Sequence, residues 1–353
     1  MKRLVVAGCG ATGLALVQNL RTLGENPILY DLPINNHRLQ EISRQGGFFC
    51  QDGGERVKID HVQVEPDPQT AFSQADEIFV AMVANRHQEF LERCSRFIPP
   101  KAAVLITPGQ MSSVTFAQEF RRQDLPIPLI GEVESNLHVA YLSDELTISH
   151  VLKPASRFCA AFPAADTPKL IQIFGRYYCL KPAADVLECA LNLPNIDVHP
   201  AGSLLNMGRI YRHGSHFYRD CIDPPIENCV VVQYNEKKQL MSRMGYTVRT
   251  SVANIPQIRR PADEAGGNPF HQIEGPNDLT HRYYTEELFA GLPLVVSLGK
   301  VIGSPVSMAQ ALLTIGSAAL GQDFYRLGRT LENLGIPAQS PEELRNFLAA
   351  GRL

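Results

Sequence analysis

The sequence predicts an α/β fold in which a doubly wound sheet is followed by a mostly α-helical domain. A glycine-rich turn at residues 8–13 joins a short β-branched strand to an apolar helical pattern. Strand-like and helix-like segments then alternate up to about residue 184. Beyond that point apolar residues recur at intervals of three and four, which is typical of helices. We therefore expect two domains, residues 1–184 and residues 185–353.

Composition limits the classes of partner. The 353 residues are 44% hydrophobic and 20% charged, enough for a sizeable core and more than one domain. A net charge of -3 creates no field that would collect nucleic acid or an anionic membrane, and no apolar run is long enough for a transmembrane helix. The 8 cysteines form no Cys-x-x-Cys pair, which fits reduced thiols in a cytoplasmic protein without a metal site. We expect small-molecule partners and leave a homodimer open.

The glycine-rich turn reads Gly-x-Gly-x-x-Gly and predicts a Rossmann-type dinucleotide site. Gly8 would allow the tight turn, Gly10 the close approach of a pyrophosphate, and Gly13 the packing of the helix on the sheet. The helix N-terminus would supply unpaired N–H groups and a positive dipole end. The residues expected to contact the cofactor here are Gly8, Gly10, Ala11, Thr12 and Gly13.

Asp31 ends the second predicted strand, residues 27–30. A carboxylate there would accept hydrogen bonds from the adenosine ribose and repel a 2′-phosphate, which favours NAD(H). Alternatively, Asp31 only begins a turn or caps the helix after Pro33. His37 and Arg38 follow closely and could balance a phosphate, so NADP(H) stays open.

Two loops are expected to follow strand ends of the parallel sheet. Gln110 lies in Pro-Gly-Gln after one strand, and Glu132 follows the next. Ligands bind at these carboxyl ends in doubly wound sheets, so both side chains are predicted to face the cleft; the alternative is ordinary loop chemistry. The later strands are expected at residues 77–83, 103–107, 128–130, 146–149 and 158–162, the last two extending the sheet.

The helical half carries a candidate proton-transfer group. His199 lies between a polar Asn-Leu-Pro-Asn segment and a Pro-Ala-Gly turn that opens an apolar helix. An imidazole held there could exchange a proton near neutral pH, although a structural histidine is the alternative. Glu286 and Glu287 precede a helix expected at residues 288–298, where the dipole would keep a carboxylate ionised; that helix-end role is itself the alternative to catalysis.

These motifs together resemble the opine dehydrogenases, the family of octopine dehydrogenase and the octopine and nopaline synthases. The similar blocks are Gly-Cys-Gly-Ala-Thr-Gly at 8–13, Pro-Gly-Gln at 108–110, Gly-Glu at 131–132, Asn-Leu-Pro-Asn-Ile-Asp-Val-His-Pro at 192–200, His-Arg-Tyr-Tyr-Thr-Glu-Glu at 281–287 and Asp-Phe-Tyr-Arg-Leu-Gly-Arg-Thr-Leu-Glu-Asn-Leu-Gly at 323–335. The resemblance implies NAD(P)H-dependent condensation of an amino acid with a 2-oxo acid, through an imine, to a secondary amine.

The resemblance also implies roles for individual residues. His199 would be the proton-transfer residue and Glu287 its acidic partner, where many members have Asp. Arg282 would clamp a substrate carboxylate, its alternative being an ion pair with Glu286 or Asp278. The remaining substrate-binding residues would be Gln110, Glu132, His138 and Asn192.

Two departures from the family pattern bear on the amino acid donor. The chain has no Trp, and His138 replaces a Cys that several members have. Two other functions remain open on the same two-domain plan: a 2-oxo-acid or ketone reductase that needs no amine, and a regulatory protein that binds NAD(H) without turnover.

Overall fold

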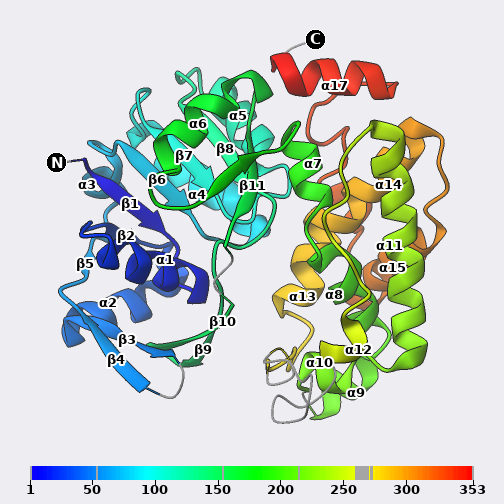
Figure 1. Cartoon of the computed structure of the whole chain (residues 1–353), viewed down its shortest axis with the longest axis horizontal. Coiled ribbons are helices and arrows are strands. Elements are labelled where there is room, and N and C mark those ends of the chain that lie inside the picture. The colour runs from blue at the N-terminus through cyan, green and yellow to red at the C-terminus, as the bar shows by residue number, and fades with distance from the viewer. Residues whose placement is uncertain are drawn as a thin grey trace. The chain divides into compact units, whose positions relative to one another are not determined.

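The structure of the chain is a computed structural model (Figure 1). It describes residues 2–52, 55–152, 155–213, 215–258, 270 and 273–351. The chain divides into two compact units, of which one comprises Met1–Ala190 with Ala349–Gly351 and the other Leu191–Leu348. The fold class is α/β, as the sequence predicts.

The first unit is built on an eight-stranded sheet with the order β12-β11-β8-β7-β6-β1-β2-β5. All neighbours from β5 to β8 are parallel. The strand expected at residues 158–162 does extend this sheet as β11, although it runs antiparallel to β8. The chain order reverses at β1, between β2 and β6, and such a switch point is where doubly wound sheets bind ligands. The strands are β1 Leu4–Ala7, β2 Ile28–Tyr30, β5 Gln63–Val64, β6 Glu77–Val80, β7 Ala103–Ile106, β8 Leu129–Val133, β11 Arg157–Ala161 and β12 Leu180–Pro182.

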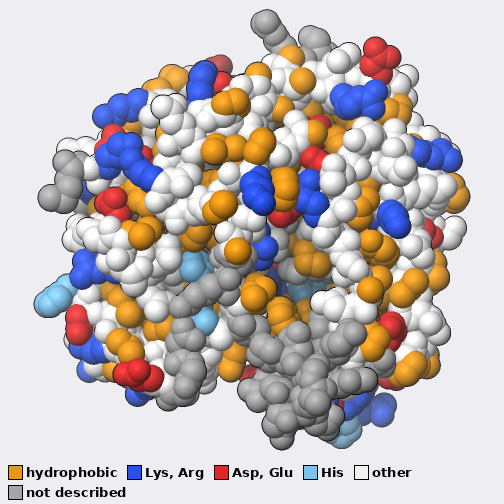
Figure 2. Space-filling model, in the orientation of Figure 1, with side chains coloured by type: hydrophobic (Ala, Val, Ile, Leu, Met, Phe, Trp, Pro, Cys, Tyr) orange, Lys and Arg blue, Asp and Glu red, His pale blue; other side chains and the backbone are white. Residues whose placement is uncertain are grey.

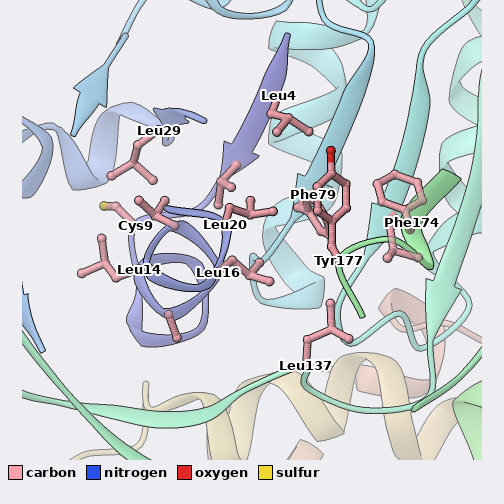
Figure 3. Close-up of a cluster of buried hydrophobic side chains, with 14 of the residues drawn as sticks. Leu4, Cys9, Leu14, Leu16, Leu20, Leu29, Phe79, Leu137, Phe174 and Tyr177 are labelled. Atoms are coloured by element: carbon pink, nitrogen blue, oxygen red, sulfur yellow. The ribbon is translucent and has the colours of Figure 1, made fainter. Parts of the chain in front are cut away.

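Helices cover both faces of this sheet. Side chains of β1 alternate between the faces, because successive strand residues point to opposite sides: Leu4 and Val6 enter one core, and Val5 and Ala7 the other. The first core also takes side chains from α1 (Ala11–Thr22), α2 (Asn36–Gln45) and α6 (Thr167–Phe174), as Figure 3 shows in part. The second core takes aromatic side chains from α3 (Pro68–Phe72), α4 (His87–Cys94) and α5 (Ser112–Arg122).

A second sheet, with the order β4-β3-β10-β9, was not foreseen in the sequence. The strand expected at residues 146–149 to extend the main sheet is part of β10 in this smaller one, which corrects that prediction. Ile148 and Phe48 lie in the same core as α1, so burial against that helix determines the pairing. The strands are β3 Gly47–Asp52, β4 Glu55–Asp60, β9 Val139–Asp144 and β10 Thr147–Leu152.

The second unit is helical over its described residues, apart from an isolated bridge between His216 and Glu274. Its longest helix, α11, starts at an Asp223 cap that accepts from Ile226 N and ends at left-handed Gly245. The helices of this unit are α8 Asn195–Leu204, α9 Met207–His213, α10 Phe217–Asp220, α11 Pro224–Met244, α12 Ile255–Ile258, α13 Arg282–Glu286, α14 Leu292–Ile302, α15 Ser307–Leu320 and α16 Phe324–Leu327. Two further helices cross the boundary between the units: α7 Val186–Leu191 and α17 Pro341–Ala350.

Basic and acidic side chains are interspersed on the face shown in Figure 2. Within the described part of the chain, no helix has the length and apolarity needed to cross a membrane. Among the same residues no group of three or more His, Cys, Asp or Glu side chains is arranged to hold a metal ion.

Candidate active site

The glycine-rich turn connects β1 to α1 at the switch point of the sheet. Gly8 has φ +121°, and a Cβ there would lie 2.4 Å from the carbonyl oxygen of Ala81, just after β6. A Cβ on Gly13 would lie 1.7 Å from the Gly8 oxygen, whereas one on Gly10 would meet nothing within 4 Å. Packing therefore requires glycine at 8 and 13, and the space above Gly10 is open. α1 begins without a side-chain cap or an acidic residue in its first turn, so its N–H groups can receive an anion.

Asp31 is buried beside this turn and fastens it to the end of β2. Its Oδ2 accepts from Cys9 N at 2.5 Å and from Asn35 Nδ2 at 3.1 Å, and its Oδ1 accepts from Leu32 N at 2.6 Å. Asp31 therefore does begin a turn, which is the alternative to a role in binding the cofactor. Two carboxylate oxygens offer about four acceptor positions, so the same group can also accept from a ribose hydroxyl.

Arg38 also lies near the turn, where its charge acts on the Cys9 thiol. Burial and Asp31 raise the pKa of Cys9, and Arg38 opposes that rise. A basic group at this place is what a cofactor 2′-phosphate would need.

The loop after β7 is strained and held by Glu132. Gln110 and Met111 both have left-handed φ, 52° and 66°, which costs non-glycine residues roughly 1–3 kcal/mol each and is concentrated at functional sites. Glu132 is fully buried, and it accepts from Met111 N at 2.9 Å, Ser113 N at 3.0 Å and Ser113 Oγ at 2.8 Å. A Cβ on Gly109 would lie 2.2 Å from the Glu132 Cβ. Glu132 therefore orders the loop that carries Gln110.

His138 is buried in the first unit among other rings. Its Nε2 lies 2.9 Å from Tyr178 Oη, and its ring centroid is 5.5 Å from that of His150.

His199 and Glu287 meet in the second unit, as predicted, although 88 residues separate them. His199 Nδ1 lies 3.3 Å from Glu287 Oε1, and both side chains are almost wholly buried. The imidazole stacks on Tyr283 with ring centroids 3.7 Å apart and planes at 19°, and Phe217 meets it edge-on at 5.5 Å. Gly202 makes room, since a Cβ there would lie 2.6 Å from Phe217 Cζ. Because Glu287 engages Nδ1, Nε2 is the nitrogen that can exchange a proton with a substrate.

Glu287 begins a π-helical turn, Glu287–Gly291, between α13 and α14. The expectation that it lies in the first turn of a helix is wrong, because the helix already begins at Arg282. π turns widen the backbone and are frequent at functional sites. Here Phe289 O accepts from Arg329 N at 2.7 Å, and a Cβ on Gly291 would lie 2.8 Å from Glu287 Oε2. The turn and its glycine therefore determine where the carboxylate lies.

The surroundings of His199 favour its neutral form. Burial lowers its pKa well below the usual value, Arg282 lowers it further, and Glu286 opposes the shift. The ring is consequently neutral at neutral pH and able to accept a proton.

Arg282 and Asn192 already have protein partners. Arg282 Nη1 lies 3.3 Å from Glu286 Oε2, so that predicted alternative ion pair exists, while 39% of the Arg282 side chain stays exposed. Asp278 instead accepts from Thr280 N at 2.7 Å. Asn192 donates to Thr247 O at 3.0 Å and accepts from Arg249 N at 2.7 Å.

The sequence motifs do not identify several polar residues of the second unit. These are Tyr283, which stacks on His199, and the buried side chains of Gln233, Asp197 and Lys237. A usable signal existed for Gln233 and Lys237, because both interrupt the apolar face of α11 with polar groups.

The chain is similar to known proteins in both sequence and structure. The family model for the α-helical domain of NAD/NADP octopine/nopaline dehydrogenase matches residues 182–320. Opine dehydrogenase of Arthrobacter sp. (strain 1C) is 25% identical over 364 residues, covering 98% of this chain and 98% of that protein. A structure of octopine dehydrogenase with NADH and agmatine has a TM-score of 0.73 at 13% identity, covering 100% and 99% of the two chains. A ketopantoate reductase of the PanE/ApbA family from Ralstonia eutropha JMP134 has a TM-score of 0.62 at 16% identity, covering 90% and 97%.

A doubly wound sheet with a glycine-rich turn, together with a helical unit that buries an imidazole–carboxylate pair, defines a two-unit NAD(P)-dependent oxidoreductase. The ketopantoate reductase shows that this fold is shared by enzymes of different names. The match of the helical domain and the relative that is covered over its full length go further: in both, the proteins that the chain resembles are opine dehydrogenases.

Proposed function

We propose that the chain catalyses the NAD(P)H-dependent reductive condensation of an amino acid with a 2-oxo acid to an N-(carboxyalkyl) amino acid, and the reverse oxidation. The observation that carries this proposal is the buried pair of His199 and Glu287, 3.3 Å apart and stacked against Tyr283. The octopine dehydrogenase structure that holds NADH and agmatine has the same fold.

His199 performs the proton transfers. The amino donor arrives as an ammonium ion and must lose a proton before its nitrogen attacks the carbonyl carbon; the neutral imidazole takes that proton at Nε2. The imidazolium returns the proton to the departing hydroxyl of the carbinolamine, which leaves as water and gives the protonated imine. Glu287 holds the tautomer through Nδ1 and stabilises the imidazolium. The nicotinamide, when bound, supplies the hydride that reduces the imine.

The cofactor residues fit a dinucleotide. The open space over Gly10 and the uncapped start of α1 suit a pyrophosphate. We assign the ribose diol to Asp31 and therefore NAD(H) as the preferred cofactor, with NADP(H) kept as the alternative because Arg38 lies beside the turn. Ala11 and Thr12 contribute the first N–H groups of the helix.

The substrate residues divide into contact and support. Arg282 is assigned to a substrate carboxylate, because a planar guanidinium binds one through two hydrogen bonds and can exchange Glu286 for it. Gln110 is assigned to the amino donor on the strength of its strained backbone. Glu132, His138 and Asn192 remain proposed members of the substrate site, where their observed bonds order the surrounding segments.

One assay separates this function from a reductase that needs no amine, which the shared fold with ketopantoate reductase keeps open. NADH oxidation is followed with pyruvate, 2-oxoglutarate or oxaloacetate, each with and without a panel of amino acids. We expect consumption only when both substrates are present, with a secondary amine detected by mass spectrometry. A rate that does not depend on the amine would establish the reductase, and cofactor binding without consumption under any pairing would establish a regulatory protein.

A further inference from the structure

The phenol ring of Tyr283 covers one face of the His199 imidazole. Tyr283 belongs to α13 and His199 to α8, and their ring centroids lie 3.7 Å apart with planes at 19°. Carbon atoms of packed groups touch at roughly 3.5–4.0 Å. A centroid separation this small leaves almost no offset, so the two buried rings lie nearly face to face.

Two further rings fix Tyr283 in this position. Phe217 lies edge-on to Tyr283 at 4.8 Å, with planes at 69°, and edge-on to His199 at 5.5 Å. His281 lies edge-on to Tyr283 at 4.7 Å, with planes at 85°. Neutral aromatic rings prefer the edge-on arrangement, because the positive rim of one ring meets the negative face of the other. The pair of His199 and Tyr283 is therefore the exception among these four rings.

A face-to-face stack suits His199 better with an extra proton than without one. Two neutral rings stacked in this way place their negative faces against each other. An imidazolium is positively charged, and the negative face of a phenol ring attracts a cation that lies within about 6 Å of its centroid. The same packing is therefore unfavourable for the neutral imidazole and favourable once Nε2 has taken up a proton. Interactions that strengthen as a reaction advances are the ones that accelerate it.

The charged neighbours of His199 act on its edge or oppose one another. Burial and Arg282 disfavour the imidazolium and lower the pKa of His199, while Glu286 opposes them. Arg282 Nη1 lies 3.3 Å from Glu286 Oε2, so these two charges are paired. Glu287 Oε1 lies 3.3 Å from Nδ1, at the edge of the imidazole. The π face of a neighbouring ring therefore stabilises the imidazolium from a direction that these groups do not use.

We propose that Tyr283 is a positioning residue that orients the imidazole and stabilises its protonated form through a cation–π contact while the substrate proton resides on Nε2. The inference rests on the proposed function and gives its proton-transfer step a residue beyond His199 and Glu287. The phenol takes part as a neutral ring, because burial raises the pKa of Tyr283. The neighbouring His281 ring is neutral as well, since burial lowers its pKa to about 4.

Two substitutions of Tyr283 test the inference through the steady-state kinetics of NADH oxidation with an amino acid and a 2-oxo acid. Tyr283→Phe keeps the ring and its face, and we expect its kcat to stay within about threefold of that of the unmodified chain. Tyr283→Leu keeps an apolar side chain without a π face, and we expect kcat to fall by about tenfold or more, the size of a cation–π contact away from water. Equal losses in the two variants, or an unchanged kcat in Tyr283→Leu, would overturn the inference.

Tyr284 provides the matched control for packing. It is the next residue of α13, it is fully buried, and its Oη donates to Ser203 O at 3.0 Å. Tyr284→Leu therefore removes a buried phenol from the same helix while the stack on His199 remains. We expect it to lower the unfolding midpoint at least as much as Tyr283→Leu does, but to lower kcat by no more than about threefold. A loss of kcat as large as that in Tyr283→Leu would mean that packing alone explains the effect.

The division of the effect between kcat and KM separates His199 from Arg282, whose Cζ lies 5.2 Å from the same ring centroid. The imidazolium exists only after the substrates have bound, so we expect Tyr283→Leu to leave KM for both substrates nearly unchanged. A higher KM for the 2-oxo acid with an unchanged kcat would show that the ring serves Arg282 instead, and would overturn the inference.

The unmodified chain shows which of the two proposals fails. A rate that does not depend on the amine would contradict the proposed function and leave the comparison of Tyr283→Phe with Tyr283→Leu valid, because an oxo-acid reductase also needs a protonated His199 to donate to the alkoxide. Amine-dependent turnover with equal losses in the two variants would overturn the role of Tyr283 alone. NADH consumption under no pairing would contradict both.

Discussion

At the scale of single residues, the candidate site depends on a glycine that leaves room for its neighbours as well as on the polar side chains themselves. Gly291 is the last residue of the π turn, and a methyl group there would lie 2.8 Å from Glu287 Oε2 and 3.0 Å from Ile196 Cγ1. Interiors are packed like crystals, so neither neighbour can move far. The residue that lacks a side chain thus determines the position of the carboxylate that orients His199.

We expect Gly291→Ala to slow turnover by about tenfold or more, because displacing a catalytic group by a fraction of an ångström costs alignment. Gly208→Ala is the control: Gly208 also lies in a helix, but a Cβ there would meet nothing within 4 Å. Steady-state kinetics of both variants make the comparison. Equal rates in the two would mean that Glu287 tolerates the displacement.

We expect His199→Ala to lower turnover by a factor of about 100 or more, since general acid–base catalysis contributes on that order. NADH affinity should stay nearly the same, because His199 and the glycine-rich turn belong to different units. Fluorescence titration with NADH beside the kinetic assay checks both statements. Lost cofactor binding in this variant would point to a role in folding.

At the scale of elements, helix α8 is built around a proline that interrupts its own hydrogen bonds. Pro200 follows His199 directly and leaves the Ile196 carbonyl without a helical donor. A buried carbonyl without a partner costs free energy, and Gln233 of α11 supplies the missing donor. The two helices are therefore joined by a polar bond close to His199 in the chain, in addition to apolar packing.

We expect Gln233→Leu to lower the free energy of unfolding by about 1–3 kcal/mol, the cost of leaving a buried acceptor unsatisfied. Gln239→Leu, on the exposed side of the same helix, should change it by no more than about 0.5 kcal/mol. Denaturant unfolding of both variants measures the difference. Similar midpoints would show that the Ile196 carbonyl finds another donor.

For the whole molecule, stability should fall on acidification because two histidines of the second unit must stay neutral. Burial, Arg282 and His199 together lower the pKa of His281 to about 4, and the neutral ring accepts from Tyr283 N at the start of α13. Burial lowers the pKa of His199 as well. A pKa depressed in the folded state means that the unfolded chain binds the proton more tightly. The stabilisation is thus complete above about pH 6.5 and is lost as the pH falls through about 4.

We expect the unfolding midpoint to decrease from pH 7 to pH 4.5, and to decrease less in His281→Asn. Asparagine is a good helix cap and does not titrate, so it keeps the bond to Tyr283 N without the proton linkage. Calorimetry at several pH values measures both slopes. Identical slopes would assign the acid sensitivity to other groups.

The sequence by itself determined the features that depend on local rules. The glycine-rich turn, the alternation of strands and helices and the change to helical periodicity follow from backbone sterics and side-chain spacing, which neighbouring residues dictate. His199 and Glu287 were found through a family resemblance, and their motifs alone left the structural alternatives open.

Tertiary structure alone decided what depends on residues distant in the chain. The second sheet forms because α1 offers an apolar face to Phe48 and Ile148. The π turn that places Glu287 is completed by Arg329 N. Asp197 and Lys237 are removed from water by the packing of α8 against α11. Burial is a property of the folded chain, and it is burial that turns these ordinary side chains into a site.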